Sequence, residues 1–293
     1  MKKEILSAFS RVVLRPQGWS ANLTAVSLSL IFATALLSFQ KEFREYPGME
    51  YTDFKLPSDY KQPAEFVFAR MMYPNAPGRF GGFGRFGDWH QGSTNWTNDY
   101  PRADRHLLTA FRRLTRIDTR SVEQPVNLED GDDVYNWPFL YAARGGSMWL
   151  TDEMVVKLRD YLDRGGFLIL DDMWGDAEYE VCLQNVQRIF PGTSPTEVDD
   201  KDPVFHTVYD LDKRYQISGQ WSLGSGVPYL YGGIVPHWQG IWDEKTGRMR
   251  MAVWVNNDTG DSWEWADDPL YPERYSALGI RLAVNHVMYA MTH

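Results

Sequence analysis

The chain has 293 residues, 43% of them hydrophobic, and a formal net charge of −9. This length and apolar content suffice for one domain of ordinary to large size with its own core. Residues 1–22 carry +3, from four basic residues against one acidic residue, so the remainder carries −12. A body of that sign repels phosphate backbones, which disfavours a nucleic-acid partner. The single cysteine, Cys182, has no partner for an internal disulfide, and no Cys/His spacing typical of zinc sites occurs.

An uncharged apolar segment, LTAVSLSLIFATALLSF, covers residues 23–39. As a helix it would measure roughly 25 Å, at the short end of what spans a bilayer. Because the basic residues precede it, the positive-inside rule predicts a single-pass anchor in the inner (cytoplasmic) membrane. Residues 1–22 would then be cytoplasmic and the main domain periplasmic. The alternative is a cleaved signal peptide, since Ala33-Thr34-Ala35 resembles a cleavage site.

Residues 40–63 contain three prolines and scattered charges, which is typical of a linker lying over or leading to the domain, expected over 64–293. A strand is expected at 65–71, followed by a Gly/Arg/Phe-rich loop at 74–92. This loop matches no phosphate-binding glycine motif. It is interpreted as a partner-docking loop or an ordered surface loop. Its contact candidates are Arg79, Phe80, Phe83, Arg85, Phe86 and Trp89.

The following elements alternate between helices and strands. Pro101 suits the first turn of a helix in which Leu107, Leu108, Phe111 and Leu114 recur at helical spacing. Short strands are expected at 116–119 and 137–142, and Thr151 can cap a helix that Gly165-Gly166 ends.

The apolar run FLILDD at 167–172 comes directly after those glycines and is typical of a strand buried on both faces of a parallel sheet. A helix at 178–189, a hairpin at 240–256 turning at 245–247, and a helix at 272–291 follow. Together these elements predict a three-layered α/β domain with a mostly parallel sheet.

Several segments together resemble the bacterial family of unknown function known as DUF4159. They are FARMMY (68–73), WTNDYPRADRHL (96–107), WPFLYA (137–142), GGFLILDD (165–172), RIFPG (188–192), DPVFHTVYDL (202–211) and RLAVNHVMYA (281–290). The resemblance covers residue 65 to the end of the chain. It implies a flavodoxin-like sheet similar to class I glutamine amidotransferases, a domain that is commonly exported or membrane-attached, and no established activity.

An amidotransferase of that fold needs a cysteine on a sharp strand-to-helix turn and a histidine base. Cys182 lies instead inside a predicted amphipathic helix, where a small buried apolar side chain is expected. Gly224-Ser225-Gly226 lacks the flanking strand and helix of a nucleophile elbow and is interpreted as a loop. We therefore predict no catalytic residue and no cofactor.

The strongest polar candidates are Asp171 and Asp172, at the carboxyl end of the buried strand, where open α/β sheets place their ligands. A divalent metal there could also use Asp88, His90 and His206 if the Gly-rich loop folds over the strand ends. Alternatively, Asp172 caps the next turn or hydrogen-bonds a neighbouring loop. The remaining polar residues are interpreted structurally: Asp99 as a helix cap, Asp104 as an exposed charge or a partner of Arg102, Arg105, Arg112 or Arg113, and His237 as a structural side chain.

Aromatic residues make up 15% of the chain, with 12 tryptophans, a composition that is typical of contact surfaces. The alternative is that these side chains are ordinary anchors of the core and the loops. The sequence thus predicts a non-catalytic, membrane-anchored, exported subunit that docks on or scaffolds an integral-membrane protein complex, such as an electron-transfer or photosynthetic assembly. The alternative is an exported metal-dependent hydrolase or carbohydrate-binding domain that uses Asp171 and Asp172.

Overall fold

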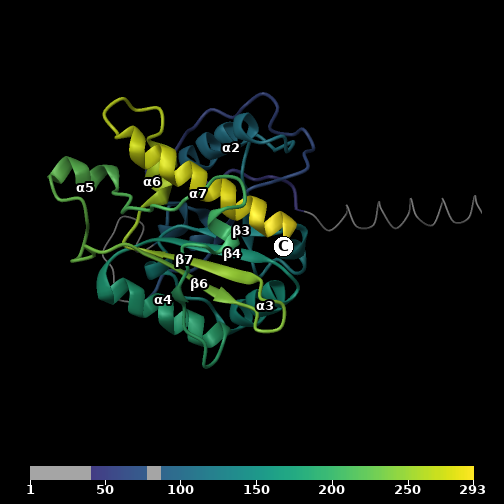
Figure 1. The fold of residues 1–293 in the computed structure, drawn as a ribbon. Helices are drawn as coiled ribbons and strands as arrows, with labels where there is room; N and C mark the ends of the chain where they lie inside the picture. The colour runs from purple at the N-terminus through teal and green to yellow at the C-terminus, as the bar shows by residue number, and fades with distance from the viewer. Residues whose placement is uncertain (1–40, 78–86) are drawn as a thin grey trace, which may run out of the picture. The chain divides into compact units, whose positions relative to one another are not determined.

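Seven strands form one mostly parallel sheet in the order β2-β1-β3-β4-β7-β6-β5 (Figure 1). The structure is a computed structural model and describes residues 41–77 and 87–293. The pairs β2–β1, β1–β3, β3–β4 and β4–β7 are parallel, whereas β6 is antiparallel to both β7 and β5. The strands are β1 (Ala69–Met72), β2 (Gln124–Asn127), β3 (Phe139–Ala142), β4 (Phe167–Met173), β5 (Thr196–Glu197), β6 (His237–Trp242) and β7 (Met249–Val255).

Helices cover both faces of this sheet, with α2, α6 and α7 on one side and α3 and α4 on the other (Figure 1). The α-helices are α2 (Arg102–Leu114), α3 (Asp152–Asp163), α4 (Gly175–Ile189), α5 (Gln220–Ser225), α6 (Thr259–Glu264) and α7 (Glu273–Thr292). The short 3₁₀ helices are η1 (Trp89–Gln91), η2 (Asn95–Thr97), η3 (Asp133–Asn136), η4 (Gly145–Ser147) and η5 (Pro203–Phe205). The predicted α/β architecture with a mostly parallel sheet is confirmed.

Alternate residues of the buried strands supply two separate cores. In β4, Phe167 and Ile169 belong to one hydrophobic cluster, with side chains of α2 and α7, whereas Leu168 and Leu170 belong to the other, with side chains of α3 and α4. All seven residues of β4 are buried. This is the arrangement expected of a strand covered by helices on both faces. Thr151 caps α3 as predicted, its side chain accepting a hydrogen bond from the Met154 N–H.

Three local predictions were wrong. The strand expected at 116–119 reduces to one isolated bridge between Thr119 and Phe66, and the strand beside β1 is instead β2, which contains Pro125. Proline removes a ladder donor, and it is tolerated here because β2 lies at the edge of the sheet. Leu114, expected on the core face of its helix, is 46% exposed. Residues 224–226 were expected to form a loop, but Gly224 and Ser225 are the last residues of α5, and Gly226 is its C-cap with φ 78°.

The segment predicted as a linker lies over the domain. Glu45 is 2.5 Å from Arg105 of α2, and Arg102 of α2 donates to the Tyr51 hydroxyl at 3.0 Å. The compact unit that contains the sheet runs from Glu42 to His293, so the predicted boundary at residue 64 falls inside it.

The predicted anchor at 23–39 and the segment 1–22 lie outside the described residues. Within 41–77 and 87–293, no helix is both long and apolar enough to cross a membrane.

Candidate functional site at the carboxyl edge of the sheet

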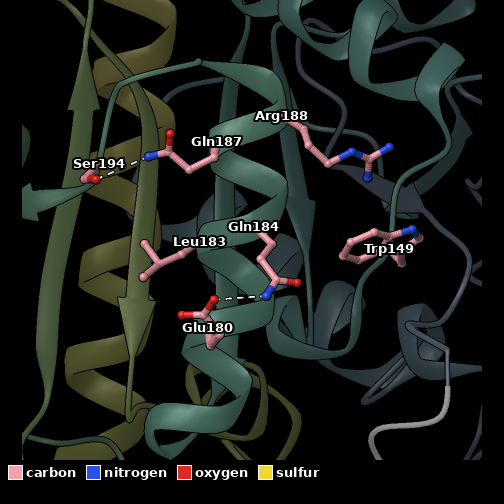
Figure 2. A pocket seen from close by; sticks show the side chains of 7 residues that line it. All are labelled: Trp149, Glu180, Leu183, Gln184, Gln187, Arg188 and Ser194. Atoms are coloured by element: carbon pink, nitrogen blue, oxygen red, sulfur yellow. Dashed lines mark hydrogen bonds between the residues drawn. The ribbon is translucent and has the colours of Figure 1, made fainter.

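A surface pocket lies beside α4 (Figure 2) and is lined by Trp149, Glu180, Leu183, Gln184, Gln187, Arg188 and Ser194. Its polar side chains already have partners. Gln184 donates to Glu180 at 2.9 Å, Gln187 contacts Ser194 at 3.3 Å, and Arg188 pairs with Asp152 at 2.8 Å while lying over the Trp149 ring. Among the described residues, none of those that line the pocket has a buried polar side-chain atom without a hydrogen-bond partner. We therefore assign no chemistry to this pocket.

The carboxyl edge of the sheet gathers seven carboxylates instead. Since β4 and β7 are parallel neighbours, the residues that follow them meet at one edge. Asp171 and Asp172 end β4, and the turn into α6 follows β7. The group, called the carboxylate cluster below, consists of Glu50, Asp99, Asp171, Asp172, Asp258, Asp261 and Glu264. All but Glu50 are buried. Ionised side chains are seldom buried without a compensating partner, so this cluster is the candidate site.

The two predicted aspartates of β4 hold the neighbouring loops. Asp171 accepts hydrogen bonds from the Tyr141 hydroxyl at 2.8 Å and from the Gly260 N–H at 3.0 Å. Asp172 accepts from the Trp174 indole at 2.9 Å and lies 3.4 Å from the Asn98 amide nitrogen. Asp172 therefore hydrogen-bonds neighbouring loop residues, as its alternative interpretation predicted.

Asp99 is the centre of the cluster. One carboxylate oxygen each of Asp99, Asp258 and Asp261 lie within 4.8 Å of one another, and the same holds for Glu50, Asp99 and Glu264. Asp99 accepts from the Asn98 amide at 2.6 Å through Oδ1, whereas its Oδ2 is buried and has no hydrogen-bond partner among the described residues. Asp258 caps α6 by accepting from the Asp261 N–H at 2.9 Å.

Burial and mutual repulsion shift the acidity of these groups. Burial, followed by repulsion from Asp261, raises the pKa of Asp99 well above its usual range and that of Glu264 to about 9. Burial also raises the pKa of Asp258, Asp261 and Asp172, and that of Asp171 to about 6. The cluster therefore binds protons more tightly in the folded chain than in the unfolded chain, unless another cation neutralises it.

An arginine borders the cluster on the side of Asp172. Arg144 has a left-handed backbone with φ 47°, and its guanidinium lies 3.9 Å from Glu178. Burial raises the pKa of Glu178 to about 7, against the opposing effect of Arg144. Attraction to Asp172 and Glu178 outweighs burial and raises the pKa of Arg144. Arg144 thus places a positive charge beside the carboxylates on this side.

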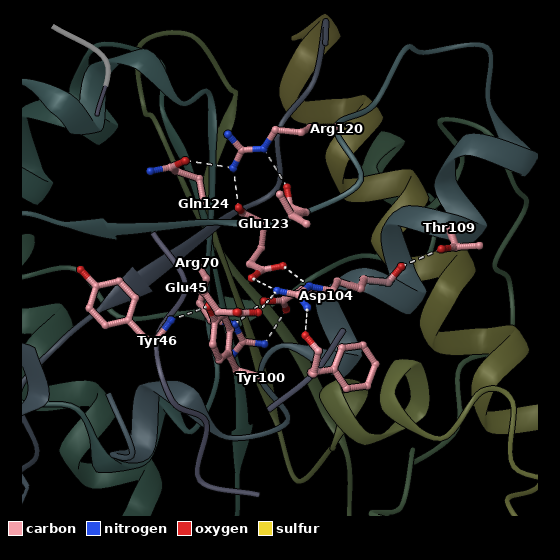
Figure 3. A network of polar contacts seen from close by, with 12 residues as sticks. Glu45, Tyr46, Arg70, Tyr100, Asp104, Thr109, Arg120, Glu123 and Gln124 are labelled. Carbon is pink, nitrogen blue, oxygen red and sulfur yellow. Dashed lines mark hydrogen bonds and ion pairs between the residues drawn. The ribbon is translucent and has the colours of Figure 1, made fainter. Parts of the chain in front are cut away.

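A separate network of buried ion pairs holds the segment that carries Asp99 (Figure 3). Arg70 of β1 contacts both carboxylate oxygens of Asp104 in α2, at 2.8 and 2.6 Å. It also donates to the backbone carbonyls of Trp96 and Asn98, at 3.1 and 3.0 Å. Asp104 is therefore buried and paired with Arg70, not with an arginine of its own helix. The network joins β1, α2 and residues 96–98. It thereby holds the backbone directly before Asp99 in place.

The other predicted metal ligands lie elsewhere. His90 pairs with Asp88 at 2.6 Å and with Glu129 at 3.2 Å, on the exposed turn at η1. His206 pairs with Asp210 at 3.0 Å after η5. Among the described residues neither histidine, nor Asp88, joins a cluster of three potential ligands. Each histidine instead pairs with carboxylates close to it. The expected joint site with Asp171 and Asp172 does not form among the described residues.

The other predicted residues fall into two groups. Arg79, Phe80, Phe83, Arg85 and Phe86 lie outside the described residues. Trp89 is half-buried, its ring packs against that of His90 at a tilt of 30°, and its carbonyl accepts a hydrogen bond from the Trp96 indole at 2.8 Å. His237, interpreted as a structural side chain, lies 2.8 Å from Glu197.

Sequence reasoning missed the centre of the site. Asp99 was interpreted as a helix cap, but α2 has Pro101 at its N-cap, and the Asp99 side chain points into the carboxylate cluster. Asp258, Asp261 and Glu264 were not singled out. The available signal was an acidic residue at every third position after the buried strand β7, a spacing that places all three on one face of a short helix.

Cys182 lies inside α4, fully buried, and burial raises its thiol pKa to about 12. This confirms the expectation of a buried helical cysteine. Such a thiol is neither on a strand-to-helix turn nor ionised at neutral pH, so it does not match an amidotransferase nucleophile.

A comparison with protein families settles what the chain is related to. Residues 85–291 match the family described as a domain of unknown function, DUF4159. The chain belongs to the DUF4159 family. The matched part of this DUF4159 protein contains every member of the carboxylate cluster except Glu50. A search of curated proteins finds no match. The family description names no activity, so the function must be argued from the structure.

Proposed function

We propose that this DUF4159 protein is a non-catalytic, membrane-anchored, exported subunit that docks on a larger integral-membrane complex. An electron-transfer or photosynthetic assembly would be a suitable host. The observation that carries the proposal is a run of exposed apolar side chains, called the apolar rim. It consists of Trp221, Val227, Tyr231, Ile234 and Val235, which are 72%, 44%, 68%, 60% and 59% exposed.

The concentration of these side chains distinguishes them from ordinary surface residues. Five of the ten large exposed hydrophobic residues in the described part of the chain belong to the apolar rim. Single exposed apolar residues are normal, whereas a concentration of them is typical of an interaction surface. Tryptophan and tyrosine are also the residues most enriched at the energetically dominant points of protein interfaces. The rim therefore supports contact with a protein partner.

Hydrogen bonds fix the segment that carries the rim. Gln216 donates to the Gly233 carbonyl at 2.7 Å, and Asn256 donates to the Val235 carbonyl at 2.6 Å. At the other end, the Gln220 N–H donates to Asp261 at 2.6 Å. A surface held in place before binding loses less conformational entropy when it binds. These contacts favour a formed docking face over a disordered loop.

The fold supports the non-catalytic part of the proposal. The five parallel strands, taken in chain order, have the spatial order 2-1-3-4-5 of flavodoxin-like sheets. We infer a flavodoxin-like, amidotransferase-like domain in which Cys182 cannot take the nucleophile's place, because it is buried within α4.

The sequence supports the choice of a membrane-bound partner. The apolar run at 23–39, preceded by basic residues, would confine the domain to the periplasmic surface of the inner membrane. Confinement raises the effective concentration of the domain toward neighbours in the same membrane. A host complex embedded in that membrane is therefore the occupant that we propose for the rim.

An exported metal-dependent hydrolase or carbohydrate-binding domain is the second candidate, and the carboxylate cluster is the observation that favours it. Asp171 and Asp172, its proposed ligands, already accept hydrogen bonds from Tyr141 and Trp174. Those bonds compete with direct use of the two carboxylates by a substrate.

Co-purification tests the docking proposal. The tagged full-length protein is extracted in mild detergent, and its partners are quantified by mass spectrometry. The test variant carries Trp221→Ser with Ile234→Ser. The matched control is Val156→Ser, because Val156 is 63% exposed on α3, outside the rim. We expect stoichiometric membrane-protein partners with the wild type and the control.

The rim variant should lose these partners at least tenfold, since a central interface tryptophan commonly contributes 2 kcal/mol or more, about a factor of 30. Its circular dichroism and thermal midpoint should match those of the wild type. Unchanged partners in the rim variant would refute the docking face. Recovery of the wild type as a free monomer would refute the proposed function as a whole.

A further inference from the structure

The triad of Asp99, Asp258 and Asp261 has the composition and spacing of a hard-cation site. Its three carboxylate oxygens lie within 4.8 Å of one another. Ca²⁺ holds oxygen ligands at about 2.3–2.6 Å, so two oxygens on one ion are separated by at most about 5 Å. The triad contains neither histidine nor cysteine, and oxygen-only ligand sets suit Ca²⁺, Mg²⁺ and Mn²⁺.

A second, independent observation is that two buried carboxylate oxygens of the cluster have no hydrogen-bond donor among the described residues. Asp99 is 1% exposed, and its Oδ2 has no hydrogen-bond donor among the described residues. Glu264 is also 1% exposed, and its Oε1 is unpaired in the same sense. A buried carboxylate oxygen without a donor costs free energy that a bound cation would recover.

Two glycines keep space around these oxygens. A Cβ atom at Gly260 would lie 2.1 Å from Oδ2 of Asp99. A Cβ atom at Gly219 would lie 2.5 Å from Oδ2 of Asp258 and 2.9 Å from Oδ2 of Asp261. Any larger residue at either position would press on the triad. Glycine at these two positions therefore leaves the space beside the triad oxygens open.

We propose that the DUF4159 domain binds a divalent cation, Ca²⁺ in preference to Mg²⁺, through the carboxylates of Asp99, Asp258 and Asp261. The second triad, formed by Glu50, Asp99 and Glu264, shares Asp99 with it. The preference for Ca²⁺ follows from burial. Mg²⁺ usually keeps several waters in a strict octahedron, whereas Ca²⁺ accepts an irregular set of protein oxygens.

The bound ion would also stabilise the segment that carries the apolar rim. The Gln220 N–H donates to Asp261, and the Asp258 N–H donates to the Ile217 carbonyl at 3.0 Å. Two triad members thus hold both sides of the entry to α5. This consequence rests on the proposed function, whereas cation binding does not.

Calorimetry on the full-length protein tests the proposal. The protein is purified in mild detergent, stripped with EDTA and titrated with CaCl₂, and separately with MgCl₂. We expect Ca²⁺ to bind more tightly than Mg²⁺ and to raise the thermal midpoint. Asp258→Asn keeps the side-chain oxygen that caps α6 and should weaken Ca²⁺ binding at least tenfold.

Asp88→Asn is the matched control, since Asp88 is an exposed aspartate outside both triads and should leave Ca²⁺ binding unchanged. If Asp258→Asn fails to fold by circular dichroism, Asp99→Asn replaces it. If the wild-type protein shows neither binding heat nor a thermal shift at millimolar Ca²⁺, the proposed cation site is refuted. Wild-type affinity in folded Asp258→Asn would overturn the ligand assignment. Neither result bears on the co-purification of the rim variant, so the two proposals fail separately.

Discussion

Replacing Arg70 by methionine should destabilise the domain strongly. Arg70 and Asp104 are both fully buried, and their side chains are joined by two hydrogen bonds, at 2.8 and 2.6 Å. Arg70 also donates to the carbonyls of Trp96 and Asn98. Arg70→Met keeps a long apolar stem but leaves the Asp104 charge and two buried carbonyl oxygens without these donors.

The expected loss follows from those contacts. Breaking a buried ion pair by removing one partner typically costs about 3–5 kcal/mol, because the other charge stays buried without compensation. A whole domain is commonly stable by only about 5–15 kcal/mol, so the variant would lose a large part of its margin. Adding Asp104→Leu to Arg70→Met should recover part of the loss, since the uncompensated charge is then gone.

Urea unfolding followed by circular dichroism measures this loss through the midpoint and slope of the transition. Arg164→Gln is the control, because Arg164 and Asp160 form an exposed pair on α3 and its cap, and such pairs contribute little. The control should have the same urea midpoint of unfolding as the wild type. A loss below about 1 kcal/mol for Arg70→Met, the range of exposed pairs, would show that the buried network does not stabilise the fold as argued.

Three further predictions concern the carboxylate cluster and the core. Burial raises the pKa of Glu264 from its usual 4.5 to about 9, so its proton stabilises the fold fully below about pH 4.5, and this contribution is lost as pH rises to 9. In EDTA, the thermal midpoint should fall between pH 5.5 and 8.5, and less so in Glu264→Gln. Gly279→Ala should lower stability by about 1–3 kcal/mol despite better helix propensity, because its Cβ would lie 1.9 Å from Oγ of Ser262. The exposed Gly224→Ala, with no atom nearby, should not lower it in the same urea titration. Cys182 should resist a thiol reagent until urea unfolds the chain, because its pKa is near 12 and it is buried.

The elements that sequence predicted well are those with strong periodic patterns and end signals. The run from Thr151 through FLILDD carried a cap, an amphipathic helix, two stopping glycines and a continuous apolar strand, and α3 and β4 formed there. The buried, helical position of Cys182 followed from the same kind of pattern. β2 was missed because QPVN has neither alternation nor β-branched enrichment, and its pairing with β1 is what makes it a strand.

The site was harder to predict because its centre depends on tertiary contacts. Asp99 precedes a proline and a helix, which locally resembles a cap, and only the packing of 96–98 on Arg70 directs it elsewhere. Glu50 lies in a segment without periodicity, so nothing local marked its Oε2 as the acceptor for the Asp99 N–H at 3.1 Å. Asp171 and Asp172 were found because the strand-end rule applies to sequence directly.

Site-specific photocrosslinking tests the docking claim most directly. A photoreactive benzoyl-phenylalanine is placed at position 221 in the rim, or at position 156 on α3 as the control, in the full-length protein in its native membranes. We predict a crosslink from position 221 to one integral-membrane protein of the complex that co-purifies with the wild type, and no such product from position 156. Absence of a product from position 221, or the same products from both positions, would contradict docking through the apolar rim.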